Sequence, residues 1–432
     1  MTIKSISLTL FGILLSFCSI AQDYPTDYLS ASFHADRRAA VKKQLSDKGV
    51  GIFFAGQTRQ RSNDTDFPYA QNKNFYYLTG LEEPNAVLLL FKQPVSLLGK
   101  TGTEFIFIQN RDPFKELWTG KILGVDGFRA KSKMENIFIN EDFKASTLPM
   151  ASIDSVFSLF RTEGIFNKYK SKEDPLSRMA GTVDSLITTF KKPVAMRSTM
   201  AIMRDLRGIK TAEEITLIKK AASISVLGHN DVMRSIKPGM KEFQAQAIME
   251  YHFKNNGSEF PGYGSINGSA ENACVLHYVT NLKTIKNGDL LLSDCAAEYH
   301  GYTADITRTI PANGKFTEAQ KTLYEIVLAA QDAGIAITDE EYGDDKVVFN
   351  GVGADSHETF FVSAEGVDFN FCKTAQKPYD TAVTASLILA KKIFGDIIEV
   401  SSDGDTADWQ SGVLLFETVF NEQPVENYLS RS

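Results

Sequence analysis

Residues 272–311, NACVLHYVTNLKTIKNGDLLLSDCAAEYHGYTADITRTIP, combine apolar strands with paired carboxylates. Two parts of this stretch, GDLLLSDCAAEY at 288–299 and YTADITRTI at 302–310, have the composition of β-strands. His300 and Gly301 lie between them, and a polar residue followed by glycine suits a two-residue hairpin turn. We therefore expect an antiparallel hairpin.

Two aspartates are expected to face the same way in this hairpin. With a two-residue turn, Asp294 lies opposite residue 307, and Asp305 is two residues from 307, so their side chains share one face of the sheet. Beside apolar residues such as Leu292 and Ile306, two like charges would repel each other and resist the loss of water. A divalent metal ion between them would remove that cost. The alternative is one solvated edge residue and one turn residue.

The surroundings of the two aspartates resemble a known family of enzymes. The segments that carry the resemblance are PGM at 238–240, SINGSAEN at 265–272, NACVLHY at 272–278, GDLLLSDCAAEYHGYTADITRTIPANGKFT at 288–317 and, in the first half, DFPYAQNKNFYYLTGLEEPNAVLLL at 66–90. They are similar, in this order, to the pita-bread metallopeptidases and, among these, to the Xaa-Pro aminopeptidases (aminopeptidase P). The resemblance covers about residues 30–336.

The resemblance implies a multidomain chain of α/β and α+β class. It predicts a creatinase-type N-terminal α/β domain, of the aminopeptidase P type, at 22–195 and a truncated pita-bread metallopeptidase domain at 196–336. Residues 337–432 match no family that we recognise, and their pattern predicts a small, unrelated, acidic α/β domain. Contacts between copies of the chain through the N-terminal domain, and so a homo-oligomer, are implied by the resemblance.

The resemblance also assigns the candidate site residues. It implies two metal ions, with Asp294 binding one and Asp305 bridging both. Hard oxygen ligands with one imidazole suit Mn2+. His277 corresponds to a histidine on the substrate side, able to hydrogen-bond the scissile amide or to move a proton, and not to a metal ligand. A buried structural histidine is the alternative there. For His229 and His252, both on predicted helices, we expect structural roles.

Three functions stay open because part of the family's ligand set is missing. The family needs a further histidine from a downstream histidine-glycine segment and two glutamates, one from a glutamate-proline-glycine segment and one near the end. After residue 336 this sequence contains neither segment. His357 lacks that context, so we assign it no ligand role. The chain is expected to hydrolyse the N-terminal Xaa-Pro peptide bond, to be a catalytically inactive family member, or to be a binding module for peptides with proline at the second position.

The N-terminus has the pattern of a signal peptide. In residues 1–21, Lys4 is followed by the apolar run LTLFGILLSFCSIA, which is too short to span a bilayer comfortably and ends in serine-x-alanine. We expect cleavage before Gln22, export to the periplasm or the exterior, and no membrane attachment afterwards. Lipid attachment at Cys18 is disfavoured because the bulky Phe17 precedes it.

Composition limits the remaining possibilities. The 432-residue chain is 43% hydrophobic, which suffices for ordinary cores, and its net charge of −7 gives no indication of nucleic-acid binding. Residues 337–432 hold 6 Lys/Arg and 18 Asp/Glu, a net charge of −12, so the chain changes character near 337. Beyond the signal peptide an odd number of cysteines gives no disulfide framework, and Cys274 and Cys295 are expected in the core.

Helices and strands can be predicted at several places. Thr211 and Glu214 form a capping box for a helix, and His34 is expected to be a surface residue or a satisfied polar residue. The apolar residues that recur at helical spacing after this cap are Ile215, Ile218, Ala222 and Val226. One further predicted helix starts after Pro238-Gly239 and stops at Gly257. The other predicted helices cover 34–48, 379–394 and 406–420, and the predicted strands cover 51–56, 85–91, 104–110, 346–353, 359–371 and 396–402.

Overall fold

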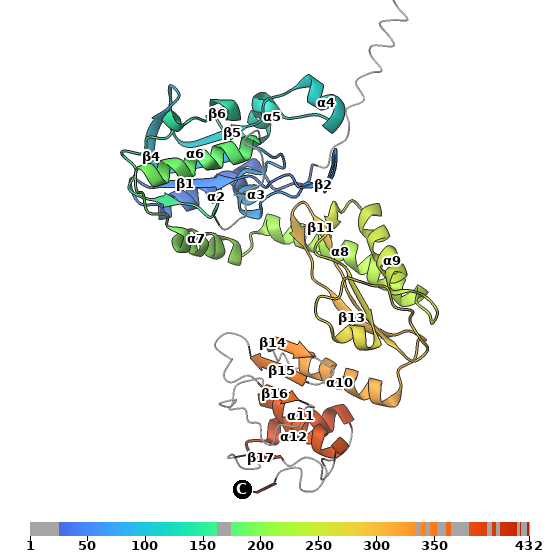
Figure 1. The fold of residues 1–432 in the computed structure, drawn as a ribbon. Coiled ribbons are helices and arrows are strands. Elements are labelled where there is room, and N and C mark those ends of the chain that lie inside the picture. Colours follow the sequence, from blue (N-terminus) through green and yellow to red (C-terminus); the bar gives the residue numbers. More distant parts are fainter. Residues whose placement is uncertain are drawn as a thin grey trace, which may run out of the picture. The chain divides into compact units, whose positions relative to one another are not determined.

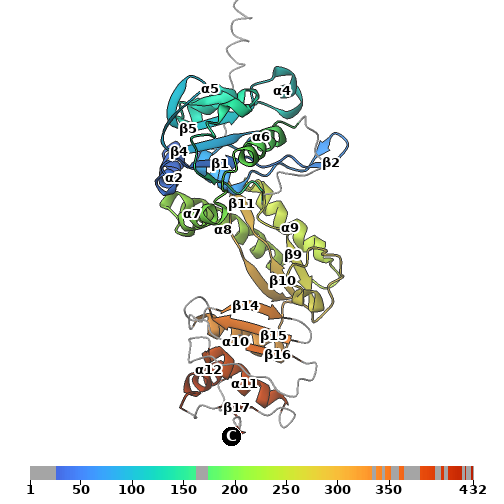
Figure 2. The same cartoon turned by 60° about the vertical axis from the view of Figure 1, so that its left-hand side comes forward.

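The computed structural model describes residues 26–161, 174–332, 337–342, 346–351, 360–363, 380–394, 400–402, 407–420, 424 and 430–431. The chain divides into two compact units, residues 1–215 and 216–432. Figures 1 and 2 show the helices and strands of each unit. The expected signal peptide lies outside the described residues.

A five-stranded mixed sheet organises the N-terminal unit. Its order is β6 (Ile137–Ile139), β5 (Lys100–Ile108), β4 (Val87–Leu97), β1 (Val50–Phe54) and β7 (Val156–Phe157). The β1–β4 and β4–β5 pairs are antiparallel, and the β5–β6 and β1–β7 pairs are parallel. Every residue of β1 is buried, so both faces of this strand are covered, which explains its continuous apolar sequence.

Helices and short elements surround this sheet. The predicted strands at 51–56, 85–91 and 104–110 correspond to β1, β4 and β5, and the helix predicted at 34–48 is α2, which packs on β4. The helices are α2 (Ala31–Gln44), α3 (Lys73–Thr79), α4 (Pro113–Thr119), α5 (Gly124–Ser132), α6 (Pro175–Thr189) and α7 (Met196–Gly208), with 3-10 turns η1 (Asn140–Asp142) and η2 (Ala145–Thr147) and a ribbon of β2 (Gln60–Ser62) and β3 (Thr65–Asp66).

The second unit begins with two helices and two small sheets. One sheet has the order β13-β10-β9 and the other the order β12-β11-β8, and all their pairs are antiparallel. The elements are α8 (Ala212–Ser235), α9 (Glu242–Asn255), β8 (Phe260–Pro261), β9 (Ile266–Ser269), η3 (Ala270–Cys274), β10 (Leu290–Asp294), β11 (Ala297–Tyr299), β12 (Tyr302–Thr303), β13 (Thr307–Pro311) and α10 (Glu318–Asp332).

Helix α8 starts at the predicted capping box but buries a different face. The Thr211 amide donates to Glu214 Oε2 (2.8 Å), and the Glu214 amide lies 3.4 Å from Thr211 Oγ1. The helix predicted from the spacing of Ile215 and Val226 is confirmed, although these two residues are exposed, at 42% and 45%, so the spacing does not mark the buried face. The buried residues of α8 include Glu214, Leu217, Ala221, Ile224, Ser225, His229 and Val232.

The acidic tail has a core of its own. The antiparallel sheet of β14 (Ile337–Tyr342), β15 (Lys346–Gly351) and β16 (Phe360–Ser363) precedes α11 (Asp380–Phe394), β17 (Ser401–Ser402), α12 (Gln410–Phe420) and β18 (Ser430–Arg431). Trp409, Phe416 and Ile388 are buried together between α11 and α12. Both predicted tail helices are therefore confirmed, while parts of the predicted strands lie outside the described residues.

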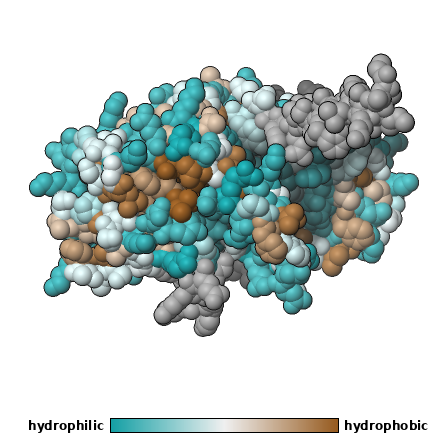
Figure 3. Space-filling model, turned by 90° about the horizontal axis from the view of Figure 1, so that it is seen from above, coloured by the Kyte–Doolittle hydropathy of each residue, from teal (hydrophilic) through white to brown (hydrophobic). Residues whose placement is uncertain are grey.

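Some apolar side chains stay at the surface. On α4, Phe114, Leu117 and Trp118 are 71%, 81% and 79% exposed. Figure 3 shows one face of the molecule, on which hydrophobic patches interrupt a mainly hydrophilic surface. Within the described part of the chain, none of the helices has the length and apolar character that a bilayer crossing requires.

His34 is a buried, hydrogen-bonded histidine of α2, so the second of its two expected roles is confirmed. It is 5% exposed, and its Nδ1 lies 3.0 Å from the Tyr77 carbonyl oxygen, which can only accept. At Gly80, where φ is +66°, an added Cβ would come within 2.5 Å of His34 Nε2. Burial lowers the pKa of His34 to about 4, against the opposing effect of the hydrogen bond to Tyr77.

This depressed pKa predicts an acid-sensitive N-terminal unit. The neutral ring is favoured in the folded state, so the contribution of His34 to stability is fully present above its unfolded pKa of 6.5 and is lost as pH falls toward 4. Between pH 7 and pH 5 the loss should be about 2 kcal/mol in the free energy of unfolding. Urea unfolding at both pH values checks this. His34→Gln should flatten the difference, whereas His277→Gln, at an exposed histidine, should preserve it; equal slopes for wild type and His34→Gln would contradict the assignment.

Candidate functional site

The hairpin that carries the two aspartates has the predicted register. Asp294 is paired with Thr307. The turn residues His300 and Gly301 have φ values of +49° and +82°, both in the left-handed region that a tight two-residue turn of this kind requires. The predicted turn is therefore confirmed.

Each strand of the hairpin is interrupted, so the expectation of two continuous strands was wrong. β10 and β13 belong to the sheet with β9, whereas β11 and β12 belong to the sheet with β8. Between these parts, the Cys295 amide donates to the Ile306 carbonyl (3.2 Å) and the Ala304 amide to the Ala297 carbonyl (3.3 Å). The hairpin passes from one sheet to the other at this point, and Asp305 lies between β12 and β13.

The hydroxyl of Tyr263 brings the two aspartates together. It donates a short hydrogen bond to Asp294 Oδ1 and lies 3.2 Å from Asp305 Oδ1. Asp294 is half-buried and Asp305 is exposed. Burial, the hydrogen bond to Asp294 and the charges of both aspartates raise the pKa of Tyr263 above its ordinary value, so the phenol keeps its proton and acts as a donor.

Tyr263 reaches the pair because the chain before it lies against the hairpin. β8 pairs with β11, and the Gly262 amide continues the contact by donating to the Ala296 carbonyl (2.8 Å). A Cβ on Gly262 would lie 2.8 Å from Cγ2 of Thr303, so a side chain there would push the two segments apart. Glycine at 262 thus permits the approach that places Tyr263 over Asp294 and Asp305.

Polar residues of α8 hold the interrupted backbone. His229 Nε2 donates to the Cys295 carbonyl (2.9 Å), and the Ala297 amide donates to Ser225 Oγ (2.9 Å). Burial lowers the pKa of His229, which favours its neutral form. These contacts give His229 a structural part. His252 Nε2 likewise has a protein partner, Asp231 Oδ2 at 2.9 Å.

His277 lies in the segment between η3 and β10 and is exposed. The alternative of a buried structural histidine is therefore wrong, and the substrate-side role stays a prediction. Cys274, close by, is also exposed, so its expected place in the core was wrong, because this segment runs over the surface. Cys295 is buried as expected, and burial raises the pKa of its thiol to about 12.

The described residues fit part of a metal centre. Two carboxylates around one point supply hard oxygen donors of the kind that Mn2+ or Mg2+ prefers. Over the described ranges no group of three or more His, Cys, Asp or Glu side chains converges in a way that could hold an ion. Within those ranges Asp294 and Asp305 could supply two ligands of a divalent ion, and their part in a metal centre stays a prediction. His357 lies outside the described residues.

Sequence reasoning missed two residues of this region. Tyr263 is 31 residues from Asp294 and 42 from Asp305, so no local spacing relates it to them. Glu242, at the start of α9, is buried beneath the segment that carries His277. The signal that was available for Glu242 is its place shortly after the proline-glycine pair at 238–239, where a helix begins.

Comparisons with known proteins agree with this architecture. The model of the aminopeptidase P N-terminal domain matches residues 34–156, and that of metallopeptidase family M24 matches residues 216–345. The Xaa-Pro aminopeptidase of Escherichia coli (strain K12) is 31% identical over 308 residues, which are 70% of this chain and 66% of that protein. The chain thus spans slightly less than two thirds of this relative.

Solved structures show the same likeness. Escherichia coli aminopeptidase P with the inhibitor Pro-Leu superposes with a TM-score of 0.60 at 29% identity, covering 71% of this chain and 68% of that one. Pseudomonas aeruginosa aminopeptidase PepP gives a TM-score of 0.60 at 31% identity, covering 72% and 70%. Both family models match in the order of the two compact units, and the likeness in fold and sequence extends over both; the chain therefore belongs to the aminopeptidase P family of metallopeptidases.

Proposed function

We propose that this protein is a metal-dependent aminopeptidase that acts on peptides with proline at the second position and hydrolyses the bond before that proline. The observation that carries the proposal is the shared contact of the Tyr263 hydroxyl with Asp294 and Asp305, since it gathers two carboxylates at one point. Membership of the aminopeptidase P family supports the reaction class.

Asp294 and Asp305 are the proposed ligands, and Mn2+ is the proposed ion. A divalent ion bound there supplies Lewis-acid polarisation of the substrate carbonyl and a lower pKa for its water ligand. Asp294, half-buried and hydrogen-bonded, offers the more rigid carboxylate, while the exposed Asp305 faces solvent, from which a peptide can enter. Tyr263 holds both in place through its hydroxyl.

His277 is the proposed group on the substrate side. Its exposure leaves the imidazole accessible to a peptide, and an imidazole can hydrogen-bond the scissile amide or pass a proton to the leaving nitrogen. A proline amide has no N–H, so recognition falls to the shape of the ring and to the free α-amino group before it. The Escherichia coli relative bound to the inhibitor Pro-Leu supports proline peptides as the ligand class.

A catalytically inactive member that binds proline peptides is the second candidate. The specific observation in its favour is that the sequence after residue 336 contains neither a histidine-glycine nor a glutamate-proline-glycine segment. Under this candidate the pair at Asp294 and Asp305 binds an ion weakly, and peptides are held without hydrolysis. For either candidate we propose export, on the pattern of residues 1–21.

Hydrolysis of an internally quenched peptide with proline at the second position tests the proposal. With Mn2+ added, the wild-type chain should release the N-terminal residue, and Asp305→Ala should lose about a hundredfold or more of kcat/KM, because several kcal/mol of stabilisation by the ion is removed. Glu325→Gln, which removes an exposed carboxylate of α10, is the matched control and should keep wild-type activity. Equal release by wild type and Asp305→Ala would exclude hydrolysis at this pair, and peptide binding without release would favour the second candidate.

Metal binding can be measured separately from activity. Bound Mn2+ should stabilise the folded chain by mass action, by about 2.7 kcal/mol at a hundred times Kd, and should raise the melting temperature at pH 7. Asp294→Asn/Asp305→Asn should abolish this rise. If wild type and the double variant shift equally, the hairpin is not the metal site.

Tyr263→Phe tests the role of the shared hydroxyl. Removing the donor leaves both carboxylates free to turn away from a common point, so we expect Mn2+ affinity to fall about tenfold or more, as for other groups that orient metal ligands. Titration calorimetry with Mn2+ measures it. Tyr324→Phe, on α10, is the control; unchanged affinity in Tyr263→Phe would show that the hydroxyl does not organise the site.

A further inference from the structure

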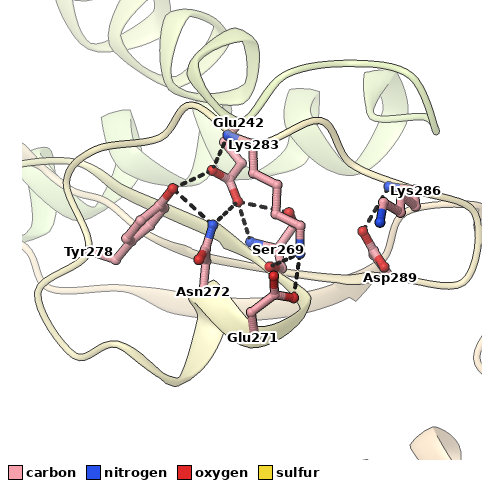
Figure 4. A network of polar contacts seen from close by, with 8 residues as sticks. All are labelled: Glu242, Ser269, Glu271, Asn272, Tyr278, Lys283, Lys286 and Asp289. Carbon is pink, nitrogen blue, oxygen red and sulfur yellow. Dashed lines mark hydrogen bonds and ion pairs between the residues drawn. The ribbon is translucent and has the colours of Figure 1, made fainter.

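The segment that carries His277, residues 270–283, is hydrogen-bonded to one buried carboxylate, that of Glu242. Glu242 is 0% exposed. Its Oε1 accepts hydrogen bonds from the Ser269 amide and hydroxyl, both at 2.8 Å, and from Asn272 Nδ2 at 3.1 Å. Figure 4 shows Glu242 at the centre of this network, with the segment wrapped around it.

The other oxygen of Glu242 binds the far side of the same segment. Oε2 accepts from the Tyr278 hydroxyl (2.8 Å) and from the Lys283 amide (2.9 Å). Tyr278 also accepts a hydrogen bond from Asn272, whose Nδ2 lies 2.9 Å from the Tyr278 hydroxyl oxygen. Glu242, Asn272 and Tyr278 thus close a ring of hydrogen bonds, and the residue directly before Tyr278 is His277.

Neutral donors compensate the buried charge of Glu242. The ammonium of Lys283 contacts Glu271 instead, at the surface. Burial disfavours the ionised form of Glu242, yet the hydrogen bonds from Ser269, Tyr278 and Asn272 outweigh it and lower the pKa of this carboxyl below its usual value. The carboxylate is therefore ionised and accepts from donors on both sides.

A second anchor fixes the end of the segment near β9. The buried Asn281, with φ at +50°, accepts from the Asn267 amide (2.9 Å) and donates to the Ser265 carbonyl (2.8 Å) and to Gln246 Oε1 (3.0 Å). Between the residues held by Glu242 and Asn281, the middle of the segment is exposed, as shown by Leu276, whose exposed fraction is 55%. The base of the segment is rigidly held while its tip faces solvent.

We propose that Glu242 is a positioning residue for His277: it fixes Tyr278 and so sets where the adjacent imidazole lies. This rests on the proposed function, in which His277 meets the substrate. Consecutive Cα atoms are about 3.8 Å apart, so a shift of Tyr278 moves His277 with it. A group that acts on a bound peptide loses efficiency when it is displaced by about 1 Å.

Glutamine cannot replace Glu242 in this arrangement. Each oxygen of the carboxylate accepts from a backbone amide, from Ser269 on one side and from Lys283 on the other. A backbone N–H can only donate, so whichever way the Gln amide is turned, its NH2 group faces one of these donors. Glu242→Gln must therefore release one side of the segment.

The test compares three variants of the full chain. Glu242→Gln breaks the network, and Tyr278→Phe removes only the hydroxyl that binds Glu242 and provides a milder change should Glu242→Gln fold poorly. Glu271→Gln is the matched control, because it alters the exposed contact with Lys283 in the same segment and spares Glu242. Two readouts are needed, one independent of activity.

The first readout is the ring resonance of His277 in protein labelled at histidine, assigned with His277→Gln, together with hydrogen exchange of 270–283. Glu242→Gln and Tyr278→Phe should shift or broaden this resonance and speed exchange about tenfold or more, whereas Glu271→Gln should leave both as in wild type. Unchanged signals in both network variants would overturn the proposal. This readout decides it even if the wild-type chain shows no hydrolysis, an outcome that would refute only the proposed function.

The second readout is hydrolysis of the proline peptide. Glu242→Gln should lower kcat about tenfold or more with little change in KM, since a misplaced His277 affects the reacting state more than ground-state binding. In a His277→Ala background the same substitution should cost little further, because the group it positions is already absent. An undiminished loss in that background would mean that Glu242 acts by another route, and the proposal would be wrong.

Discussion

The register of the β10–β13 hairpin is the constraint on which the candidate site depends. Strand side chains alternate, so a slip of one residue would send Asp294 to the opposite face from Asp305 and dissolve the pair. The turn that fixes the register is itself fixed: His300 Nδ1 lies 2.6 Å from Glu259 Oε1, and the His300 amide donates to Glu259 Oε2 (3.0 Å). Although burial opposes it, these bonds from His300 hold the pKa of Glu259 below its usual value. An exposed turn would not be pinned in this way.

Polar groups buried against the hairpin then decide its shape. Where the strands pass from one sheet to the other, backbone groups lose regular partners, and Ser225 and His229 of α8 provide replacements. Apolar spacing could not choose the buried face of α8, because the helix carries a second apolar stripe. Leu217, Ala221, Ile224 and Val232 form this stripe, and it lies on the same buried face as Ser225 and His229, while Ile215 and Val226 are exposed. Buried polar residues that serve a neighbouring backbone are invisible to a rule that counts apolar side chains.

The sequence could predict features that depend on one short segment, but not those that depend on contacts between distant segments. The turn at His300 and the juxtaposition of Asp294 and Asp305 follow from parity within one short segment, so they could be predicted from local residues alone. The interruption of the strands, the contact of Tyr263 with the two aspartates and the hydrogen bonds of Glu242 depend on segments that are distant in sequence. The hydrogen-bond partners of Glu242 lie 27 to 41 residues further along the chain. Such contacts arise from packing, and neither period nor composition encodes them. The resemblance to aminopeptidase P identified the family without identifying these supports.

In the acidic tail, residues 337–432, local patterns predicted the helices, but they do not say how the tail relates to the candidate site. Its strands and helices follow ordinary patterns, and α11 and α12 approach closely at Gly412, where a Cβ would meet Thr384 Oγ1 at 1.9 Å. Trp409 and Phe416 are buried between these helices, and α12 also contacts α10. The tail helices therefore gain stability from each other and from α10. Meanwhile, in the described sheet of the hairpin, β13 pairs with β10 alone and so forms an edge. The burial of Trp409 and Phe416 does not require the tail to pair with that edge, so any metal ligands from the tail would have to be brought to Asp294 and Asp305 by specific contacts.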